Sequence, residues 1–409
     1  MAHEGPDRVR RRRVFYIPGY DPIHPRRYRE LYRKEAASQA KISGYSIELA
    51  AKKSGGPYGW HVTGQIDGAA TEADFEVLVW SDIVRDSMGL GIFATYLQLA
   101  RTAWTYISSG ALARLMRLRK GPVIAALYPV VFLLVQLVAA LLLAWCLGRL
   151  LALIHPLAAW AGLAVVPFVL EWFRKQDGKF FAYYLMHDYA YSAQSQGANP
   201  PALEARMAEF ADRISEALQG DSDEVLVVGH SSGAHLAVSI LADLIRAGRV
   251  PAQGPTLSFL SLGQVVPMVS FLPKAGRLRA DLQFLSQRQE LSWIDVTAPG
   301  DGCAFALCDP VAVSGVAPAT GKRWPLVISA AFTQTLSPER WKELRWRFFR
   351  LHFQYLCAFD RPGDYDYFCI TAGPLPLGVR YGGRNPSVSR IERPVNKFTS
   401  LTPHADATS

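Results

Sequence analysis

Residues 225–237 read Val-Leu-Val-Val-Gly-His-Ser-Ser-Gly-Ala-His-Leu-Ala. The first four are apolar and mostly β-branched, which is typical of a strand that is buried on both faces. The pattern Gly-x-Ser-x-Gly follows at once, and residues 234–245 then have the composition of a helix. This order of strand, tight turn and helix predicts that the serine at the centre of the pattern, Ser231, lies on the turn.

The turn predicted at residues 229–233, called the elbow below, suits nucleophilic chemistry. Gly229 and Gly233 lack the side chains that would clash in a sharp turn, so the hydroxyl of Ser231 can stand clear of the sheet. The backbone N–H of Ser232, at the start of the helix, can then face the oxyanion that develops during acyl transfer. The pattern also occurs by chance, and the alternative is a glycine-rich turn in some other α/β protein.

On these residues the chain resembles the α/β-hydrolase superfamily, most of all its serine esterases and lipases. The resemblance covers the regions around residues 13–43, 74–86 and 200–360, and the elbow is its only specific motif. It implies a serine nucleophile that works with a histidine base and an acid. The alternation of predicted strands and helices indicates an α/β fold, in which a mostly parallel sheet has helices on both faces.

The base is expected at His352. In the superfamily that the chain resembles, the order along the sequence is nucleophile, acid and then histidine. Downstream of Ser231 the histidines are His235, His352 and His404. His235 is one turn along the elbow helix and His404 is in the tail, whereas His352 comes after the last strong strand. Residues 341–356 have a helical pattern, and the alternative is a core histidine with satisfied hydrogen bonds.

The acid is expected in the loop that follows a strand predicted at residues 293–296. This loop reads Thr-Ala-Pro-Gly-Asp-Gly-Cys, and a glycine on each side of Asp301 lets the chain turn there. The arrangement resembles the acid loop of the superfamily. Asp295, inside the predicted strand, and Asp309, before a proline, are the alternative acids. A solvated turn aspartate would also have the local sequence of Asp301.

A second oxyanion donor is expected near the N-terminus. Residues 14–22 read Val-Phe-Tyr-Ile-Pro-Gly-Tyr-Asp-Pro, a short strand that ends in a Pro-Gly turn. In many α/β hydrolases an early strand ends in a glycine-containing loop that supplies this N–H. By that resemblance the candidates are Gly19, Tyr20 and Asp21, and we assign the role to Tyr20. An ordinary loop after a core strand is the alternative.

Two long apolar runs predict a membrane hairpin. Residues 122–147 and 150–170 contain no charged side chain, and each run is long enough to cross a hydrocarbon core of ~30 Å at ~1.5 Å per residue. Several basic residues precede the first run and follow the second, which keeps both flanks in the cytoplasm by the positive-inside rule. These residues are Arg114, Arg117, Arg119 and Lys120, then Arg174, Lys175 and Lys179. A re-entrant insertion or a buried apolar lid is the alternative.

Composition agrees with a partly membrane-embedded protein. Of the 409 residues 50% are hydrophobic and 19% charged, and the net charge is +9. The basic clusters lack interleaved aromatic residues and any nucleic-acid motif, so an anionic membrane surface is the expected partner and nucleic acid is not. The five cysteines and the scattered histidines lack metal-ligand spacing. We therefore expect no metal, no cofactor and a reduced, cytoplasmic setting.

These patterns divide the chain into five parts. We expect a basic N-terminal arm at 1–12, a hydrolase-like domain at 13–110 and 176–382, a membrane hairpin at 111–175, and a disordered tail at 383–409. The expected function is that of a membrane-anchored serine hydrolase on the cytoplasmic side of the inner or plasma membrane. Its substrate would be a carboxylic ester or thioester, with a lipid ester as one form. The alternative is a non-catalytic membrane-bound scaffold with the same fold.

Overall fold

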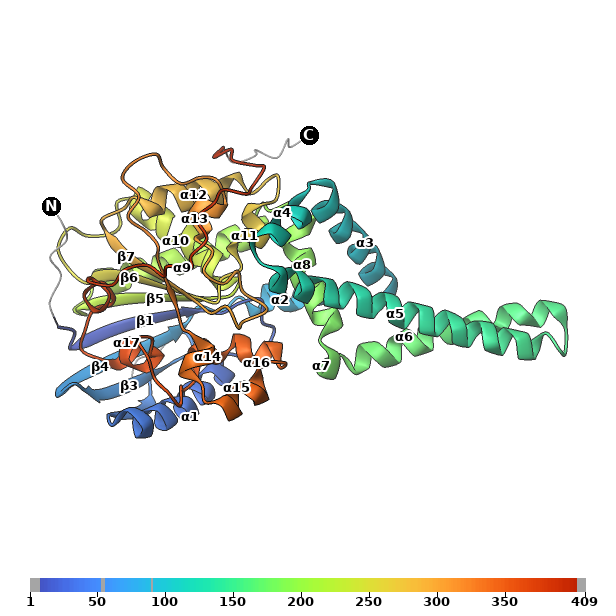
Figure 1. Cartoon of the computed structure of the whole chain (residues 1–409), viewed down its shortest axis with the longest axis horizontal. Helices are drawn as coiled ribbons and strands as arrows, with labels where there is room; N and C mark the ends of the chain where they lie inside the picture. The colour runs from blue at the N-terminus through green and yellow to red at the C-terminus, as the bar shows by residue number, and fades with distance from the viewer. Residues whose placement is uncertain (1–7, 53–55, 90, 403–409) are drawn as a thin grey trace.

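A computed structural model describes residues 8–52, 56–89 and 91–402 (Figure 1). Its centre is an eight-stranded sheet with the strand order β2-β3-β4-β1-β5-β6-β7-β8. The strands are β1 (Arg11–Ile17), β2 (Ser46–Ala51), β3 (Gly59–Ile66), β4 (Ala69–Val77), β5 (Glu224–His230), β6 (Thr256–Leu262), β7 (Leu291–Thr297) and β8 (Leu326–Ser329). Strands β4, β1, β5, β6, β7 and β8 are parallel, which confirms the predicted mostly parallel sheet.

The other edge of the sheet is antiparallel. Residues 45–49 and 60–66 alternate and are joined by a glycine-rich link, a pattern that predicts a hairpin, and β2 and β3 form one. The run Phe-Glu-Val-Leu-Val-Trp at residues 75–80 predicts a strand from Phe75, but β4, which pairs antiparallel with β3, begins six residues earlier at Ala69. Asp67 and Gly68 connect them with positive φ angles of 52° and 71°. Asp-Gly is a strong signal for a two-residue hairpin turn, and it explains the earlier start of β4.

Helices cover both faces of the sheet, as predicted. The helices are α1 (Arg26–Ser43), α2 (Ser81–Met88), α3 (Ile92–Ser108), α4 (Ala111–Leu118), α5 (Lys120–Leu151), η1 (Pro156–Ala164), α6 (Val165–Lys175), α7 (Asp177–Phe180), α8 (Ala182–Gln194), α9 (Pro201–Leu218), α10 (Gly233–Arg246), α11 (Val266–Ser270), α12 (Gly276–Ser286), α13 (Pro310–Val313), α14 (Phe332–Thr335), α15 (Pro338–Leu344), α16 (Phe348–His352), η2 (Gln354–Leu356), α17 (Tyr367–Ala372) and α18 (Leu377–Arg380).

The elbow strand β5 is buried on both faces, which accounts for its run of apolar residues. Val225 and Val227 pack into one core cluster with side chains of α9, α10 and α12. Leu226 and Val228 pack into a second cluster on the opposite face, with side chains of α1 and α17. Successive side chains of a strand point to opposite faces, so a central strand with helices on both sides needs apolar residues at every position.

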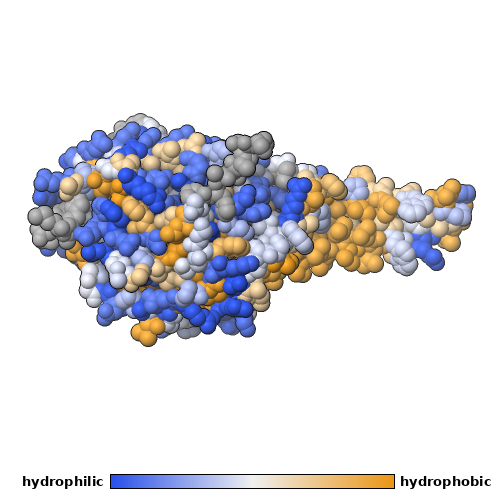
Figure 2. Space-filling view, turned by 90° about the horizontal axis from the view of Figure 1, so that it is seen from above, coloured by the Kyte–Doolittle hydropathy of each residue, from blue (hydrophilic) through white to orange (hydrophobic). Residues whose placement is uncertain are grey.

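A long arm, Lys120–Lys175, projects from the globular part (Figure 1). It consists of α5, which returns through η1 and α6, and each of the two limbs has the length and hydropathy of a membrane-crossing helix. Its large apolar side chains face outward: the exposed fraction is 84% at Leu153 and 74% at Phe168. Figure 2 shows the resulting apolar surface in orange along the side of the arm. Soluble domains rarely expose an apolar patch of this extent.

Glycines allow the two limbs of the arm to pack closely. A Cβ added at Gly162 would lie 2.4 Å from the carbonyl oxygen of Ala144, and one added at Gly148 would lie 2.7 Å from that of Ala159. Small residues of this kind let helix backbones approach each other where apolar surroundings provide no hydrophobic driving force. Arg119, the residue directly before the arm, connects the base of the arm to the globular part, because its Nε donates to the carbonyl oxygen of Ala306 at 2.8 Å.

Both ends of the described chain are more ordered than the sequence predicted. The N-terminal arm was expected to extend to residue 12, but β1 begins at Arg11 and Arg12 is fully buried. The Arg12 guanidinium pairs with Glu224 at 2.5 Å and also donates to the carbonyl oxygens of Gly373 and Leu375, both at 2.8 Å. A guanidinium with this many partners can be buried in a central strand.

The C-terminal segment was expected to be disordered from residue 383. Through residue 402 it instead packs on the globular part. Ile391 forms a β-bridge with Cys308, and the side chain of Val395 is buried. The side-chain amide of Asn396 donates to the carbonyl oxygens of Ser270 and Phe398, at 2.9 and 2.7 Å. The polar composition of this segment reflects hydrogen bonds made along an irregular path, which composition alone does not distinguish from disorder.

Candidate active site

The structure has the elbow that the sequence predicted. Ser231 lies between β5 and α10 with a φ of 56°, a strained conformation for a residue other than glycine. The neighbouring glycines are needed for the turn. A Cβ at Gly233 would lie 2.1 Å from the carbonyl oxygen of Ile17, and one at Gly229 would lie 2.8 Å from the Cα of Ala234. The Ser231 backbone N–H donates to the carbonyl oxygen of Leu262 at 2.9 Å, which ties the elbow to the adjacent strand.

The loop after β1 passes directly beside the elbow serine. A Cβ added at Gly19 would lie 3.0 Å from the Cβ and 3.4 Å from the Oγ of Ser231, so only glycine leaves the hydroxyl room. Other elements hold this loop in place. Trp80 Nε1 donates to the backbone carbonyl oxygen of Pro18 at 3.0 Å. The hydroxyl of Tyr184 donates to the backbone carbonyl oxygen of Tyr20. The loop is therefore anchored on both sides of Gly19.

Two backbone amides beside Ser231 are available to a ligand. Within the described residues, neither the N–H of Ser232 nor that of Tyr20 donates a hydrogen bond to the protein. Both residues line the same pocket as Ser231. Asp21, which was named with Gly19 and Tyr20 as a candidate in this loop, uses its carboxylate as a hydrogen-bond acceptor. The carboxylate binds the hydroxyl of Tyr28 and the guanidinium of Arg27. Two free amides near a nucleophile match the donors that an oxyanion requires.

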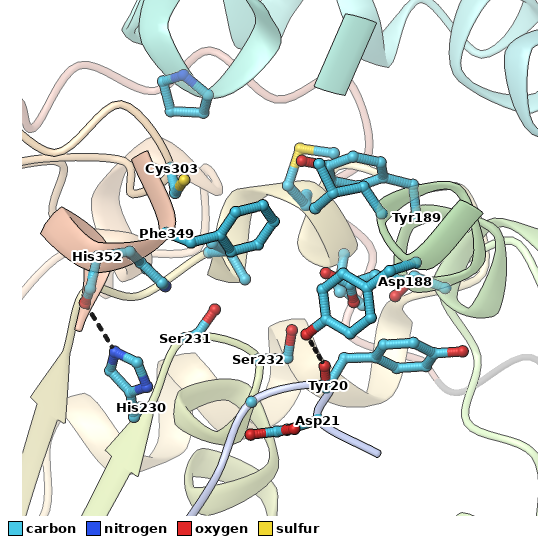
Figure 3. A pocket seen from close by; sticks show the side chains of 18 of the residues that line it. Tyr20, Asp21, Asp188, Tyr189, His230, Ser231, Ser232, Cys303, Phe349 and His352 are labelled. Atoms are coloured by element: carbon cyan, nitrogen blue, oxygen red, sulfur yellow. Dashed lines mark hydrogen bonds between the residues drawn. The ribbon is translucent and has the colours of Figure 1, made fainter. Parts of the chain in front are cut away.

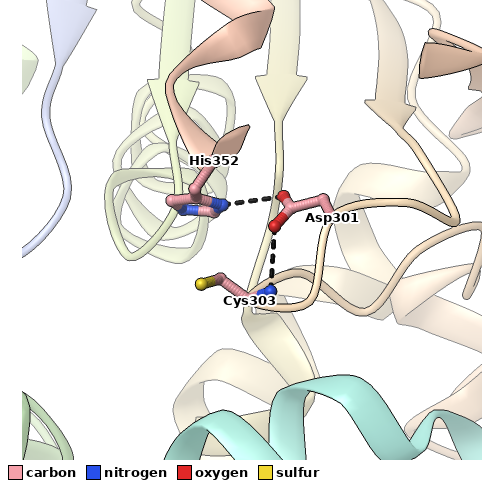
Figure 4. Close-up of side chains that lie close together, drawn as sticks. All are labelled: Asp301, Cys303 and His352. Carbon is pink, nitrogen blue, oxygen red and sulfur yellow. Dashed lines mark hydrogen bonds and ion pairs between the residues drawn. The ribbon is translucent and has the colours of Figure 1, made fainter. Parts of the chain in front are cut away.

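His352 and Asp301, which are 51 residues apart, form a buried pair (Figure 4). The Nδ1 of His352 lies 2.7 Å from the Oδ2 of Asp301. The carboxylate also accepts from the hydroxyl of Tyr355 at 3.0 Å and from the backbone N–H of Cys303 at 2.8 Å. Burial alone would raise the pKa of Asp301, but the His352 ring and these two donors outweigh it and lower the pKa below its ordinary value. The carboxylate is therefore charged at neutral pH.

This pairing determines the tautomer of the His352 ring. A carboxylate can only accept, so Nδ1 carries the proton and Nε2 of the neutral ring has a free lone pair. Within the described residues Nε2 has no hydrogen-bond partner, although it is buried. His352 and Ser231 line the same pocket, and no hydrogen bond joins Nε2 to the Ser231 hydroxyl in this structure. Such contacts are often long without a substrate and shorten when one binds.

The backbone around His352 differs from the helix expected at 341–356. The segment is broken into α15, α16 and η2, and His352 is the last residue of the five-residue helix α16. Gly263, with a φ of 54°, leaves space for the ring, since a Cβ there would lie 3.0 Å from the Cε1 of His352. The break turns the imidazole toward the ends of the parallel strands. A continuous amphipathic helix would not by itself place the imidazole at this end of the sheet.

His230, the second residue of the elbow, was not among the predicted site residues. Its Nε2 lies 3.0 Å from the carbonyl oxygen of His352 and must be the donor, because a carbonyl can only accept. Burial, together with the nearby His352 ring, lowers the pKa of His230 to about 3, so the ring is neutral. A neutral imidazole beside the proposed base holds its backbone without adding a second positive charge. The Gly-His-Ser order was visible in the sequence and was the available signal.

Figure 3 shows the pocket into which the hydroxyl of Ser231 points, below the ring of Phe349. Its volume is about 70 Å³. Asp188 of α8 also lines this pocket, although it was not predicted as a site residue. Burial raises the pKa of Asp188 to about 7, an effect that His352 partly offsets. No local sequence signal marks Asp188, because only the return of the chain from the arm brings α8 over the elbow.

The alternative residues lie outside this arrangement. Asp309 caps α13 by accepting from the N–H groups of Val311 and Ala312, and it pairs with Lys322. Asp295 accepts from the hydroxyl of Ser261 inside the sheet at 2.6 Å, and burial raises its pKa to about 8.

Of the remaining histidine candidates, only His235 lies among the described residues, and it does not line the Ser231 pocket. His235 is buried in α10, where burial lowers its pKa to about 4, and it lines a different cavity. His404 lies outside the described residues. His352 is thus the only one of the three downstream candidates that the described structure brings to the pocket of Ser231.

One group of side chains near the pocket has metal-ligand character. Ligand atoms of Asp301, Cys303 and His352 all lie within 4.8 Å of one another (Figure 4). However, the Nδ1 of His352 and the Oδ2 of Asp301 already bind each other. Burial and the charge of Asp301 raise the pKa of the Cys303 thiol, whereas metal binding requires the thiolate. The geometry therefore fits a hydrogen-bonded histidine and acid better than a metal site.

Comparison with protein-family models, with curated proteins and with solved structures finds no match to this chain.

Proposed function

We propose that the protein is a membrane-anchored serine hydrolase that cleaves a carboxylic ester or thioester. The observation that carries this proposal is the combination at one pocket of a strained elbow serine and a histidine that an acid orients. Ser231 has a φ of 56°, and the Nδ1 of His352 is bound by Asp301, which leaves Nε2 without a partner. This is the division of roles in a Ser-His-Asp site of an α/β hydrolase.

In the proposed reaction the Oγ of Ser231 attacks the acyl carbonyl carbon while Nε2 of His352 takes the hydroxyl proton. The charge on the carbonyl oxygen is held by the N–H groups of Ser232 and Tyr20. The bond to the alcohol or thiol then breaks, and His352 returns its proton to that leaving group. Water attacks the acyl-enzyme in the same way and releases the carboxylic acid. Asp301 stays ionised and stabilises the imidazolium that forms in each step.

The arm supports a membrane location. Its exposed apolar side chains would be costly in water but favourable in the hydrocarbon core of a bilayer. Basic residues are concentrated on both chain segments at the base of the arm, which favours a cytoplasmic globular part and an outward turn near Leu153. Membrane lipids and an ester or lipid substrate are the partners that follow from this proposal, and no cofactor takes part in it.

A fluorophosphonate probe tests the proposed nucleophile. We expect the probe to label the native protein at Ser231, because the activated Oγ displaces fluoride from phosphorus and His352 accepts the proton. Mass spectrometry of peptides from the labelled protein locates the adduct. Heat-denatured protein is the control and should remain unlabelled, since a serine hydroxyl without its base is a poor nucleophile. Labelling of another serine, or none at all, would contradict the proposal.

Cysteine accessibility tests the proposed orientation. Gln65→Cys and Gln289→Cys introduce thiols at exposed positions of the globular part, and Leu153→Cys introduces one at the tip of the arm. In intact cells we expect a membrane-impermeant maleimide to label only the Leu153 variant above the wild-type background. After permeabilisation all three should react. Labelling of Gln65 and Gln289 variants from opposite sides would refute the hairpin, as would release of the wild-type protein by a carbonate wash.

One observation favours a second function, that of a non-catalytic membrane scaffold with this fold. No hydrogen bond joins Ser231 to His352 in this structure, so the site could have lost its activity. The two functions give opposite results with the probe described above, because a scaffold without an activated serine does not react with a fluorophosphonate.

A further inference from the structure

A wide apolar groove adjoins the candidate pocket. It has a volume of about 900 Å³, whereas the pocket around Ser231 has only about 70 Å³. Four segments line it: the base of α5, residues 179–189, the acid loop at Gly302 and Cys303, and residues 346–350. Figure 1 shows α7 and α16 beside the base of α5. The volume is near the upper end of the range of about 300–1,000 Å³ that is usual for ligand sites.

The groove and the pocket share part of their walls. Leu185, Tyr189, Cys303 and Phe349 line both. In Figure 3 the last three of these side chains lie above the hydroxyl of Ser231, on the side toward the arm. A small acyl group fits in the pocket itself, but any longer chain attached at Ser231 has to continue past these side chains into the groove.

The mouth of the groove is apolar, exposed and basic at its rim. Ile124 of α5 and Trp346 are 63% and 72% exposed, although both are large and apolar. Lys179, Arg347 and Arg350 also line the groove, and Glu343 is the acidic partner of both arginines, so the rim has a net positive charge. Exposed apolar side chains with cations around them suit the interface of a bilayer that contains anionic lipids.

We propose that this groove binds the acyl chain of a long-chain lipid ester that enters from the bilayer, with the ester carbonyl at Ser231. The inference rests on the proposed hydrolase function and adds its substrate class. Helix α5 forms one wall of the groove and also one limb of the arm, so the chain can pass from lipid to groove along one apolar surface. This path avoids the cost of exposing the chain to water, which grows with every methylene group.

Chain-length selectivity of a blocked groove tests the inference. Ala125 is half-buried and lines the groove, so Ala125→Trp should obstruct the path of a long chain through it. We expect turnover of p-nitrophenyl palmitate in vesicles to fall by about 10-fold or more, with turnover of p-nitrophenyl acetate within about 2-fold of wild type. Val135→Trp is the matched control, because Val135 lies on the same helix, is 57% exposed and does not line the groove. It should turn over both esters like the wild type.

The outcomes separate the two proposals. Loss of palmitate turnover alone supports the groove. No loss on either ester, or an equal loss on both, would overturn the acyl-chain assignment while wild-type turnover of the acetate still supports Ser231. Absence of wild-type turnover of both esters would overturn the hydrolase proposal and this inference with it.

A second measurement does not depend on the folding of any variant. A long-chain alkyl fluorophosphonate with a photoreactive diazirine at the chain end is attached to the wild-type protein at Ser231 and then irradiated. We expect cross-links to residues that line the groove but not the pocket, such as Ile124, Tyr128 and Trp346. A short-chain probe with the same photoreactive group should cross-link only to residues around the pocket, such as Tyr184 and Asp188, which do not line the groove. Long-chain cross-links that map to α9 or α12 instead would overturn the groove assignment.

Discussion

Ser231→Ala is expected to lower turnover of a short-chain acyl ester by about 10⁶-fold, the size of loss that follows removal of the nucleophile from a serine-hydrolase site. The change removes one hydroxyl, which points into the pocket. This hydroxyl makes no hydrogen bond with the described residues. Alanine therefore leaves the packing of the elbow intact. Initial rates on p-nitrophenyl acetate measure the effect, and thermal melting by circular dichroism checks that the variant is folded.

The adjacent serine provides a matched control for this experiment. Ser232→Ala removes a hydroxyl from the same pocket but retains the backbone N–H that the mechanism assigns to the oxyanion. Its turnover should stay within about 10-fold of wild type, since side-chain changes that touch neither bond making nor proton transfer have small effects. If a folded Ser231→Ala variant retains turnover, or if Ser232→Ala is the more damaging change, the assigned nucleophile is wrong.

Asp301→Asn is expected to lower turnover by about 10⁴-fold, as the equivalent change does in a serine-protease site. The amide can donate to the Nδ1 of His352, which shifts the ring proton to Nε2 and removes the lone pair that should receive the proton of Ser231. The Cys303 N–H would still donate to the Oδ1 of the amide, which keeps the side chain at position 301 in place, whereas the Tyr355 hydroxyl can no longer donate to the nitrogen that replaces Oδ2. Turnover on p-nitrophenyl acetate is again the measurement.

Asp295→Asn is the control for the acid assignment. Burial raises the pKa of Asp295 to about 8, so its carboxyl is already neutral at pH 7 and an amide is a close substitute. Asp309→Asn should also cost little turnover, because Asp309 caps α13 and does not line the Ser231 pocket.

His352→Ala should be at least as damaging as Asp301→Asn. The variant that carries both changes should be little worse than the worse single variant, since Ser231, His352 and Asp301 act as a unit. Full activity in a folded His352→Ala variant would show that another group is the base.

The parts of the fold that follow from local chemistry could be predicted from the sequence. The apolar run of β5, the two glycines of the elbow and the helix after it are adjacent, and they specify a strand, a turn and a helix through sterics within a few residues. The hairpin of β2 and β3 and the two apolar limbs of the arm could also be predicted, because the pattern that indicates each of them lies within one continuous stretch of the chain. The early start of β4 was missed although Asp67-Gly68 marks the turn.

Other parts depend on contacts between distant residues. Arg12 belongs to a buried strand only because Glu224 and two carbonyl oxygens lie where its guanidinium ends. Residues 383–402 are ordered because they contact α11, α13 and the loop before α13, which their own polar composition does not reveal. In both cases local propensity indicated a mobile segment, and partners far along the chain stabilise an ordered one.

The same distinction applies to the candidate site. By itself the sequence predicted that Ser231 lies on a sharp strand-to-helix turn, because the apolar strand, the two glycines and the helix that specify this turn are adjacent in the chain. It also limited the base to three histidines. Only the tertiary structure decided that His352 pairs with Asp301, that His230 binds the carbonyl oxygen of His352, and that Asp188 and the groove beside α5 adjoin the pocket of Ser231. Side chains more than 40 residues apart in the sequence meet there, and only the packing of the whole chain determines which of them do.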